Sequence, residues 1–179
     1  MQQMTISNNL SVCEKIDFEI PTSGVSLAGT LTVPALANGL VIFAHGSGSS
    51  RFSPRNRYVA GVLNEHNQAT LLMDLLTAEE EEVDQRTRHL RFDIPMLAGR
   101  LVDAARWIHS RPEAAEFKIG YFGSSTGAGA ALIAAAQMPD LIGAVVSRGG
   151  RPDLAGPALE RVRCPSLFIV GGNDPVVID

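Results

Sequence analysis

Residues 123–127 (GSSTG) have the types and the spacing that nucleophilic catalysis requires. Apolar side chains at strand-like spacing precede this turn, and an alanine-rich run that favours a helix follows it. A G-x-S-x-G sequence between a strand and a helix is typical of a nucleophile elbow, where a serine on a strained corner presents its hydroxyl above the sheet. The flanking glycines leave room for strand and helix to cross close to Ser125 and tolerate unusual dihedral angles. This pattern predicts acyl transfer at Ser125.

A tetrahedral oxyanion next to Ser125 needs hydrogen-bond donors, and two stretches of the chain can supply them. The first turn of the following helix offers unpaired backbone N–H groups and the positive end of the helix dipole, which points to the N–H of Thr126. Residues 45–50 (HGSGSS) follow a continuously apolar strand and predict a second donor, the N–H of Ser47. Taken alone, this loop is equally consistent with a flexible strand-to-helix connection.

One other interpretation of these glycine-rich turns stays open, and two phosphate-binding interpretations are disfavoured by the spacing of the glycines. A tight turn in any doubly wound α/β protein also contains small residues where a helix approaches a sheet. A Walker-type phosphate loop is disfavoured because the sequence has no Gly-Lys-Ser/Thr, and the glycine spacing differs from the G-x-G-x-x-G of dinucleotide-binding turns. We therefore expect no cofactor and no metal.

The bulk composition indicates one globular domain. The chain has 179 residues, of which 45% are hydrophobic and 19% charged, and it is long enough to bury a core. A net charge of -4 disfavours a nucleic-acid partner. Cys13 and Cys164 are far apart and lie in no motif, so we expect free thiols in a reducing compartment. The sequence shows no secretory signal and no apolar run of membrane-spanning length, so the expected location is cytoplasmic, without membrane contact.

The order of the expected elements indicates an α/β fold. We expect residues 1–14 to form a flexible tail and residues 15–179 to form a single domain. Residues 15–20 and 25–33 alternate apolar and polar side chains, which predicts an antiparallel pair at a sheet edge. Continuously apolar runs predict buried parallel strands with helices on both faces. These runs are residues 40–44, 69–75, 141–147 and 166–170, and helices are expected after the elbow and at residues 58–66, 94–108 and 153–161.

A charged segment opens with four glutamates at residues 79–82. Its arginines come later, an order that suits a helix dipole, and the pairs Glu82–Arg86 and Asp84–Arg88 are one helical turn apart. We interpret this segment as a solvated helix face, with a cap over the pocket as the alternative.

Three motifs together resemble the α/β-hydrolase superfamily, and most of all its dienelactone hydrolase-like branch. They are HGSGS after one buried strand, GSSTG after a later one and GGNDP after the last, and the resemblance runs from about residue 16 to the end. It implies a mostly parallel sheet, Ser125 as nucleophile, Asp174 as the acid of a catalytic triad, and backbone donors at Ser47 and Thr126. By itself Asp174 fits a β-turn residue before Pro175 better than it fits a catalytic acid.

Two features depart from this family pattern. Dienelactone hydrolases of the type case carry a cysteine at the elbow, and a serine needs a base for activation, so general ester hydrolysis is favoured over dienelactone chemistry. The superfamily histidine follows the acid, whereas all four histidines of this sequence precede the elbow. We therefore expect the chain to be incomplete beyond Asp179, without the last strand, helix and catalytic histidine. His45, beside the oxyanion loop, is the alternative base or a substrate-binding residue.

The last apolar run has a consequence for assembly. If the chain ends at Asp179, residues 166–170 (SLFIV) form an exposed, apolar sheet edge. Natural proteins avoid such edges because unpaired backbone groups there promote aggregation. We expect either further chain to cover this edge or a second copy to cover it in a homodimer.

The predicted function is that of a serine hydrolase that cleaves a small carboxylic ester, lactone or thioester through an acyl-enzyme. Arg148 and Arg151, near the carboxyl end of a central strand, are candidate binding residues for an acidic substrate, although ordinary loop solvation explains them equally well. The alternative is a non-catalytic binding module that keeps the hydrolase scaffold and lacks the base.

Overall fold

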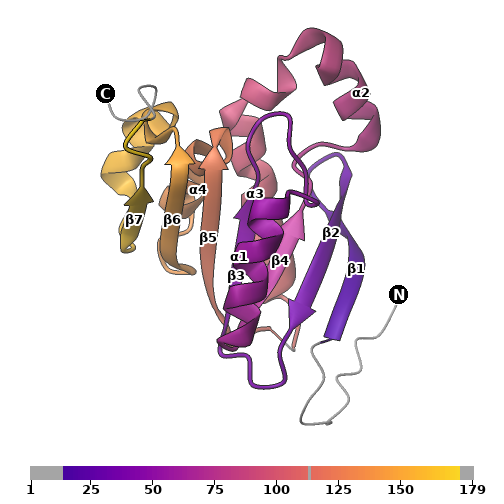
Figure 1. Ribbon diagram of the computed structural model, residues 1–179, viewed down its shortest axis with the longest axis vertical. Helices are drawn as coiled ribbons and strands as arrows, with labels where there is room; N and C mark the ends of the chain where they lie inside the picture. The colour runs from indigo at the N-terminus through magenta and orange to yellow at the C-terminus, as the bar shows by residue number, and fades with distance from the viewer. Residues whose placement is uncertain (1–13, 113, 174–179) are drawn as a thin grey trace.

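A single sheet of seven strands forms the centre of the computed structural model, which describes residues 14–112 and 114–173. The strands lie in the order β1-β2-β4-β3-β5-β6-β7 (Figure 1). The pairs β1–β2 and β2–β4 are antiparallel, and all the other pairs are parallel. The bounds are β1 Glu14–Pro21, β2 Ser26–Val33, β3 Gly39–Ala44, β4 Gln68–Met73, β5 Lys118–Ser125, β6 Ile142–Gly150 and β7 Ser166–Ile169. The predicted antiparallel start followed by a parallel sheet is confirmed.

Helices cover both faces of the sheet. Figure 1 shows α1 in front of the sheet, α3 and α4 behind it, and α2 beyond the ends of the strands. The helices are α1 Pro54–Glu65, α2 Ala78–Thr87, α3 Ile94–His109 and α4 Thr126–Gln137, with two 3-10 segments, η1 Leu90–Phe92 and η2 Pro152–Arg161. The larger core cluster packs the sheet against α3 and α4, and a smaller one packs it against α1. The predicted layers are therefore confirmed.

The apolar patterns of the strands explain their positions. β3 is apolar throughout and almost wholly buried, because helices cover it on both sides. β1 alternates exposed and partly buried positions, because only one of its faces packs against the core. An Asp93 N-cap begins α3, where its carboxylate accepts a hydrogen bond from the Met96 N–H at 3.0 Å.

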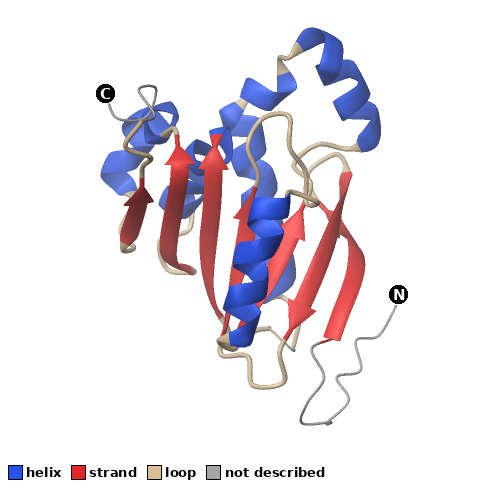
Figure 2. Ribbon diagram, in the orientation of Figure 1, coloured by secondary structure: helices blue, strands red, loops and turns tan. Residues whose placement is uncertain are grey.

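The parallel strands bring distant loops to one edge of the sheet. All of them end at the edge that carries α2 and the loop after β3 (Figure 2). β3 lies between β4 and β5 in the sheet. The chain therefore runs from β3 to β4 on one side, and from β4 it crosses to β5 on the other side of β3. Ligands of open α/β sheets bind at such a switch point, outside the carboxyl ends of the strands. The loop after β3 and the turn after β5 meet there.

The acidic segment forms α2, but its ion pairs differ from the expected ones. Asp84 is fully buried and bonds to Arg91 in η1, so the predicted pairing of Asp84 with Arg88 is wrong. Arg88 instead ends α2 in a left-handed conformation, with φ at 57°, which turns its side chain away from the helical row. Glu80 completes a capping box with Thr77 and binds Arg100.

Two further expectations concern the ends of the chain and residues 153–161. η2 covers the latter as 3-10 turns rather than an α-helix, because Gly156 has φ at 49° and Pro157 follows it.

The expected tail of residues 1–14 lies, apart from Glu14, outside the described residues, as does Cys13. Cys164 is a free thiol. Among the described helices, none combines the length and the apolar character needed to cross a bilayer.

Candidate active site

Ser125 lies at the junction of β5 and α4 in a strained backbone conformation. Its φ is 49° and its ψ is -125°, in a region that non-glycine residues rarely adopt. Such strain costs about 1–3 kcal/mol and persists only where the surrounding structure imposes it. Here β5 is held on both edges by β3 and β6, and α4 packs behind it. This is the geometry of a nucleophile elbow.

The two glycines of the motif allow backbone segments to approach that no side chain would permit. A Cβ atom at position 123 would lie 2.4 Å from the Cα of Ala128, in the helix that follows. A Cβ atom at position 127 would lie 2.4 Å from the carbonyl oxygens of both Ala44 and His45. The glycines therefore set how closely α4 approaches β5 and the loop after β3.

The loop after β3 lies directly against the elbow. A Cβ atom on Gly46 would lie 3.0 Å from the Cβ of Ser125. The backbone N–H of Ser47, one predicted oxyanion donor, donates to the Thr126 hydroxyl at 3.0 Å. Thr126 begins α4, so its own N–H has no acceptor within the helix. Ser47 and Thr126 thus lie next to each other and beside Ser125, and their role as donors stays a prediction.

His45 is held by two backbone groups. Its Nε2 accepts a hydrogen bond from the Leu75 N–H at 3.0 Å, and its Nδ1 lies 2.9 Å from the Gly46 carbonyl oxygen. This pairing places the proton on Nδ1 in the neutral ring. Burial lowers the pKa of His45, against the hydrogen bond to Gly46 and the nearby carboxylates of Asp74 and Glu81. With both nitrogens engaged, the ring has none left for the Ser125 hydroxyl.

A cleft of about 520 Å³ opens beside Ser125. The loop after β3, the start of α1, the elbow and the ends of β6 and β7 line it. Two of its lining side chains, Arg55 and Arg148, are cationic, and no carboxylate lines the described part of the cleft. The described part of the cleft next to the nucleophile therefore carries two positive charges.

Arg148 is anchored by neutral groups. Its Nη2 donates to the Ser124 hydroxyl at 2.8 Å and to the Asn56 side-chain oxygen at 3.1 Å. Burial lowers the pKa of Arg148, and the neighbouring charge of Arg55 lowers it further. The Nε atom is buried without a hydrogen-bond partner among the described residues. These contacts fix the guanidinium at the cleft while leaving part of its donor capacity unused.

The other predicted site residues lie elsewhere. Arg151 forms a two-point ion pair with Asp153, at 2.8 and 2.6 Å, on the surface and away from the cleft lining. Asp174, the predicted triad acid, lies outside the described residues. Sequence reasoning missed Arg55, Asn56 and Ser124, because a helix start and the second position of the motif carry no recognisable signal for a binding residue.

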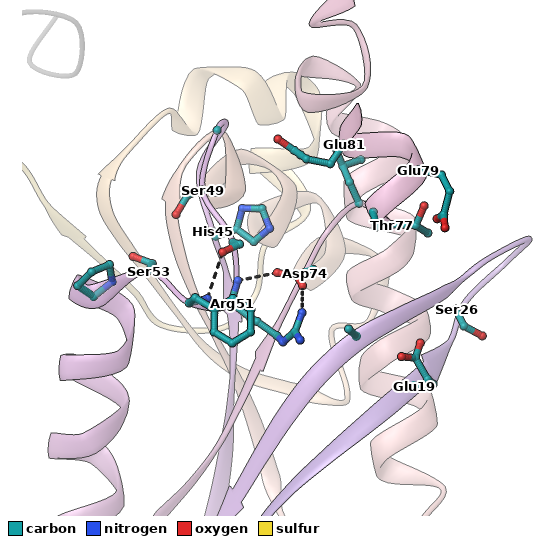
Figure 3. A pocket seen from close by; sticks show the side chains of 17 residues that line it. Glu19, Ser26, His45, Ser49, Arg51, Ser53, Asp74, Thr77, Glu79 and Glu81 are labelled. Carbon is teal, nitrogen blue, oxygen red and sulfur yellow. Dashed lines mark hydrogen bonds and ion pairs between the residues drawn. The ribbon is translucent and has the colours of Figure 1, made fainter. Parts of the chain in front are cut away.

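A larger cavity of about 800 Å³ lies on the other side of the loop after β3 (Figure 3). Arg51 crosses it and binds Asp74 twice, through its backbone N–H at 2.6 Å and through its guanidinium. Glu79 and Glu81 of α2 line the same cavity, so part of the acidic segment borders a pocket.

Within residues 14–112 and 114–173, no group of three or more histidine, cysteine or acidic side chains is arranged to hold a metal ion.

The strand order and the elbow define an α/β-hydrolase-type fold. The profile of the dienelactone hydrolase family matches residues 56–179, and the chain belongs to this family. A crystal structure of a dienelactone hydrolase from Anabaena variabilis is 58% identical, with a TM-score of 0.90 over 93% of this chain and 77% of that one. A dienelactone hydrolase-like promiscuous phosphotriesterase from metagenomic libraries shares the fold, at 19% identity and a TM-score of 0.71, over 94% of this chain and 72% of that one. The family and the Anabaena variabilis structure support a hydrolase.

Two curated relatives carry a different name. Both are putative phosphoribosyl transferases of Mycobacterium tuberculosis, and each is 55% identical over 163 residues. The match covers 91% of this chain, but the chain spans only 36% of the length of these relatives. Their name therefore describes proteins with a large additional part.

Proposed function

We propose that the protein is a serine hydrolase that cleaves a small carboxylic ester, lactone or thioester through an acyl-enzyme. The observation that carries the proposal is the conformation of Ser125, with φ at 49° on a corner that two close glycine contacts enforce. A strained serine at a helix start, next to a loop with backbone donors, is the arrangement that acyl transfer uses.

The proposed reaction has two steps. The Ser125 hydroxyl oxygen adds to the substrate carbonyl while its proton passes to a base, and collapse of the intermediate breaks the bond to the alcohol or thiol, which leaves with that proton. Water then adds to the acyl-enzyme and releases the carboxylic acid and free Ser125. The N–H groups of Ser47 and Thr126 are the proposed donors to the oxyanion.

The base is the open part of this scheme. No histidine lines the described cleft, and both ring nitrogens of His45 are bound to the backbone. We assign proton transfer to a histidine that follows Asp174 in the whole protein, with Asp174 as its orienting acid. The cleft favours esters that carry an anionic group, because Arg148 and Arg55 line it.

The alternative is a non-catalytic module that binds acyl compounds in the same cleft. The occupied nitrogens of His45 favour it for this chain alone. Binding of esters without turnover, even in the longest natural chain, would select this alternative. Phosphoribosyl transfer is not assigned to this chain, because it spans 36% of the relatives that carry that name.

Labelling with a fluorophosphonate probe, read by intact mass, tests the proposal. The chain and its Ser125→Ala variant are compared, and the experiment is repeated with the full-length protein. Loss of a triad member lowers turnover by about a million-fold, so we expect strong labelling where the proposed histidine is present and slow labelling of this chain. Label that persists in Ser125→Ala, or a full-length protein that never reacts, contradicts the proposed hydrolysis.

A further inference from the structure

The Thr126 hydroxyl occupies a backbone donor that the proposed reaction needs. Its Oγ1 atom accepts the hydrogen bond of the Ser47 N–H at 3.0 Å, across 79 positions of sequence. The bond joins the loop after β3 to the first residue of α4, directly beside the nucleophile. In the resting protein the Ser47 N–H is therefore not an empty donor that awaits a substrate oxygen.

Burial and side-chain stiffness hold this bond in place. Thr126 is only 4% exposed, and a β-branched side chain has few accessible rotamers. The surrounding backbone is equally constrained, because a Cβ atom at position 127 would lie 2.4 Å from the carbonyl oxygens of Ala44 and His45. A threonine hydroxyl that accepts a hydrogen bond keeps its own hydrogen, so it remains a neutral partner for the Ser47 N–H.

We propose that Thr126 is a positioning residue whose hydroxyl holds the Ser47 N–H in the resting state and yields it to the oxyanion of the tetrahedral intermediate. This inference rests on the proposed function. A charged oxygen forms a hydrogen bond roughly twice as strong as a neutral one. The neutral carbonyl of the substrate gains little by displacing the neutral Thr126 oxygen, whereas the oxyanion gains much. The exchange therefore favours the transition state over the bound substrate, which is the condition for a higher turnover rate.

Amide hydrogen exchange tests the resting bond without any need for activity. In Thr126→Val, which keeps the shape of the side chain and loses the oxygen, we expect the Ser47 N–H to exchange several-fold to about tenfold faster, the range that one ordinary hydrogen bond represents. Thr126→Ser keeps the hydroxyl and restores slow exchange, which separates a specific bond from general loosening. Equal protection of Ser47 in the wild type and in Thr126→Val overturns the inference.

Phosphonylation of Ser125 tests the transfer of the donor. The full-length protein is used, and the amide signal of Ser47 is followed by NMR before and after reaction. We expect this signal to shift in the adduct, because the N–H changes its partner to a phosphonyl oxygen. We expect Thr126→Val to react about tenfold more slowly, because the Ser47 N–H is no longer held beside Ser125 before the reaction, and this loss is smaller than the 10²–10³ for a missing oxyanion donor. A labelled protein with an unmoved Ser47 signal overturns the transfer and leaves the hydrolase intact. A protein that does not react overturns both.

Discussion

At the scale of single residues, the candidate site depends on backbone strain that its neighbours impose. Ser125 adopts φ of 49° because β5 is fixed in the sheet and α4 starts at once behind it. The missing Cβ atoms of Gly123 and Gly127 make that sharp change of direction possible. The backbone of the nucleophile is thus positioned by covalent geometry and by the packing of the elements on either side of it.

Arg148 is the residue that we propose for contact with the substrate. It lines the same cleft as Ser125, and neutral oxygens of Ser124 and Asn56 anchor one of its nitrogens. Arg55 adds a second positive charge at the start of α1. A guanidinium with remaining donors binds a carboxylate or a phosphate well.

We expect Arg148→Ala to weaken turnover of esters that carry a carboxylate and to spare neutral esters of the same size. A hydrogen bond to a charged group contributes about 1.5–3 kcal/mol, which corresponds to a loss of roughly tenfold to a hundredfold in kcat/KM. Steady-state kinetics of the full-length protein with matched ester pairs measure the effect. Equal losses on both kinds of ester would show that Arg148 supports the fold of the elbow and does not read substrate charge.

At the scale of elements, α2 and η1 are joined by one buried carboxylate. Asp84 is fully buried and accepts from the N–H groups of Leu90 and Arg91, at 2.8 and 3.2 Å, and from the Arg91 guanidinium at 2.5 Å. Burial acts to raise the pKa of Asp84, but the hydrogen bonds from Arg91 and from the backbone outweigh it and hold the pKa below its usual value. Arg100 connects the start of α2 to the Leu75 carbonyl, because its guanidinium donates to that carbonyl and also binds Glu80.

This arrangement predicts a loss of stability in acid. The pKa of Asp84 is lower in the folded protein than in the unfolded chain, so its contribution is present above the usual aspartate value of about 3.9 and disappears as the pH falls through the lowered folded value. We expect Asp84→Ala to cost about 3 kcal/mol at pH 7, the lower end for a broken buried pair, because Arg91 keeps some contact with water.

Urea unfolding at pH 7 and at pH 3 measures this effect. The difference between Asp84→Ala and the wild type should shrink at the lower pH. Glu82→Gln, an exposed position on the same helix, is the control and should change the free energy of unfolding little at either pH. A difference that stays constant with pH would assign the cost to lost packing and not to the ionised carboxylate.

At the scale of the whole molecule, the two sheet edges differ in character. β1 closes one side with exposed charged side chains on one face. β7 forms the other edge of the described sheet, and its residues Leu167, Phe168 and Ile169 are about half exposed. An edge strand of this kind offers both apolar surface and unpaired backbone groups to another chain.

We therefore expect this chain to associate with itself through β7. Sedimentation velocity should show an average mass that rises with concentration, and Phe168→Lys should return the chain to monomers, because a charge on an edge strand opposes pairing. Tyr58→Lys, at an exposed aromatic position on α1, is the control and should leave association unchanged. A compact monomer at every concentration contradicts this homodimer proposal.

The sequence by itself determined the elements and the elbow. Strand and helix periodicity, turn residues and the G-x-S-x-G spacing act over a few neighbouring residues, so the antiparallel start, the parallel strands with helices on both faces and the position of Ser125 could be predicted. The expected pairing of Asp84 with Arg88 failed because it assumed that helical spacing decides partners, whereas η1 folds back and brings Arg91 closer.

Only the tertiary structure decided which side chains meet at the site. The Leu75 N–H donates a hydrogen bond to His45, 30 positions away, and Arg148 donates one to Asn56, 92 positions away. The Ser47 N–H binds the Thr126 hydroxyl across 79 positions. These partners are set by the packing of the sheet and its helices, because hydrogen bonds extend only about 3 Å and no local pattern records which distant residues come that close.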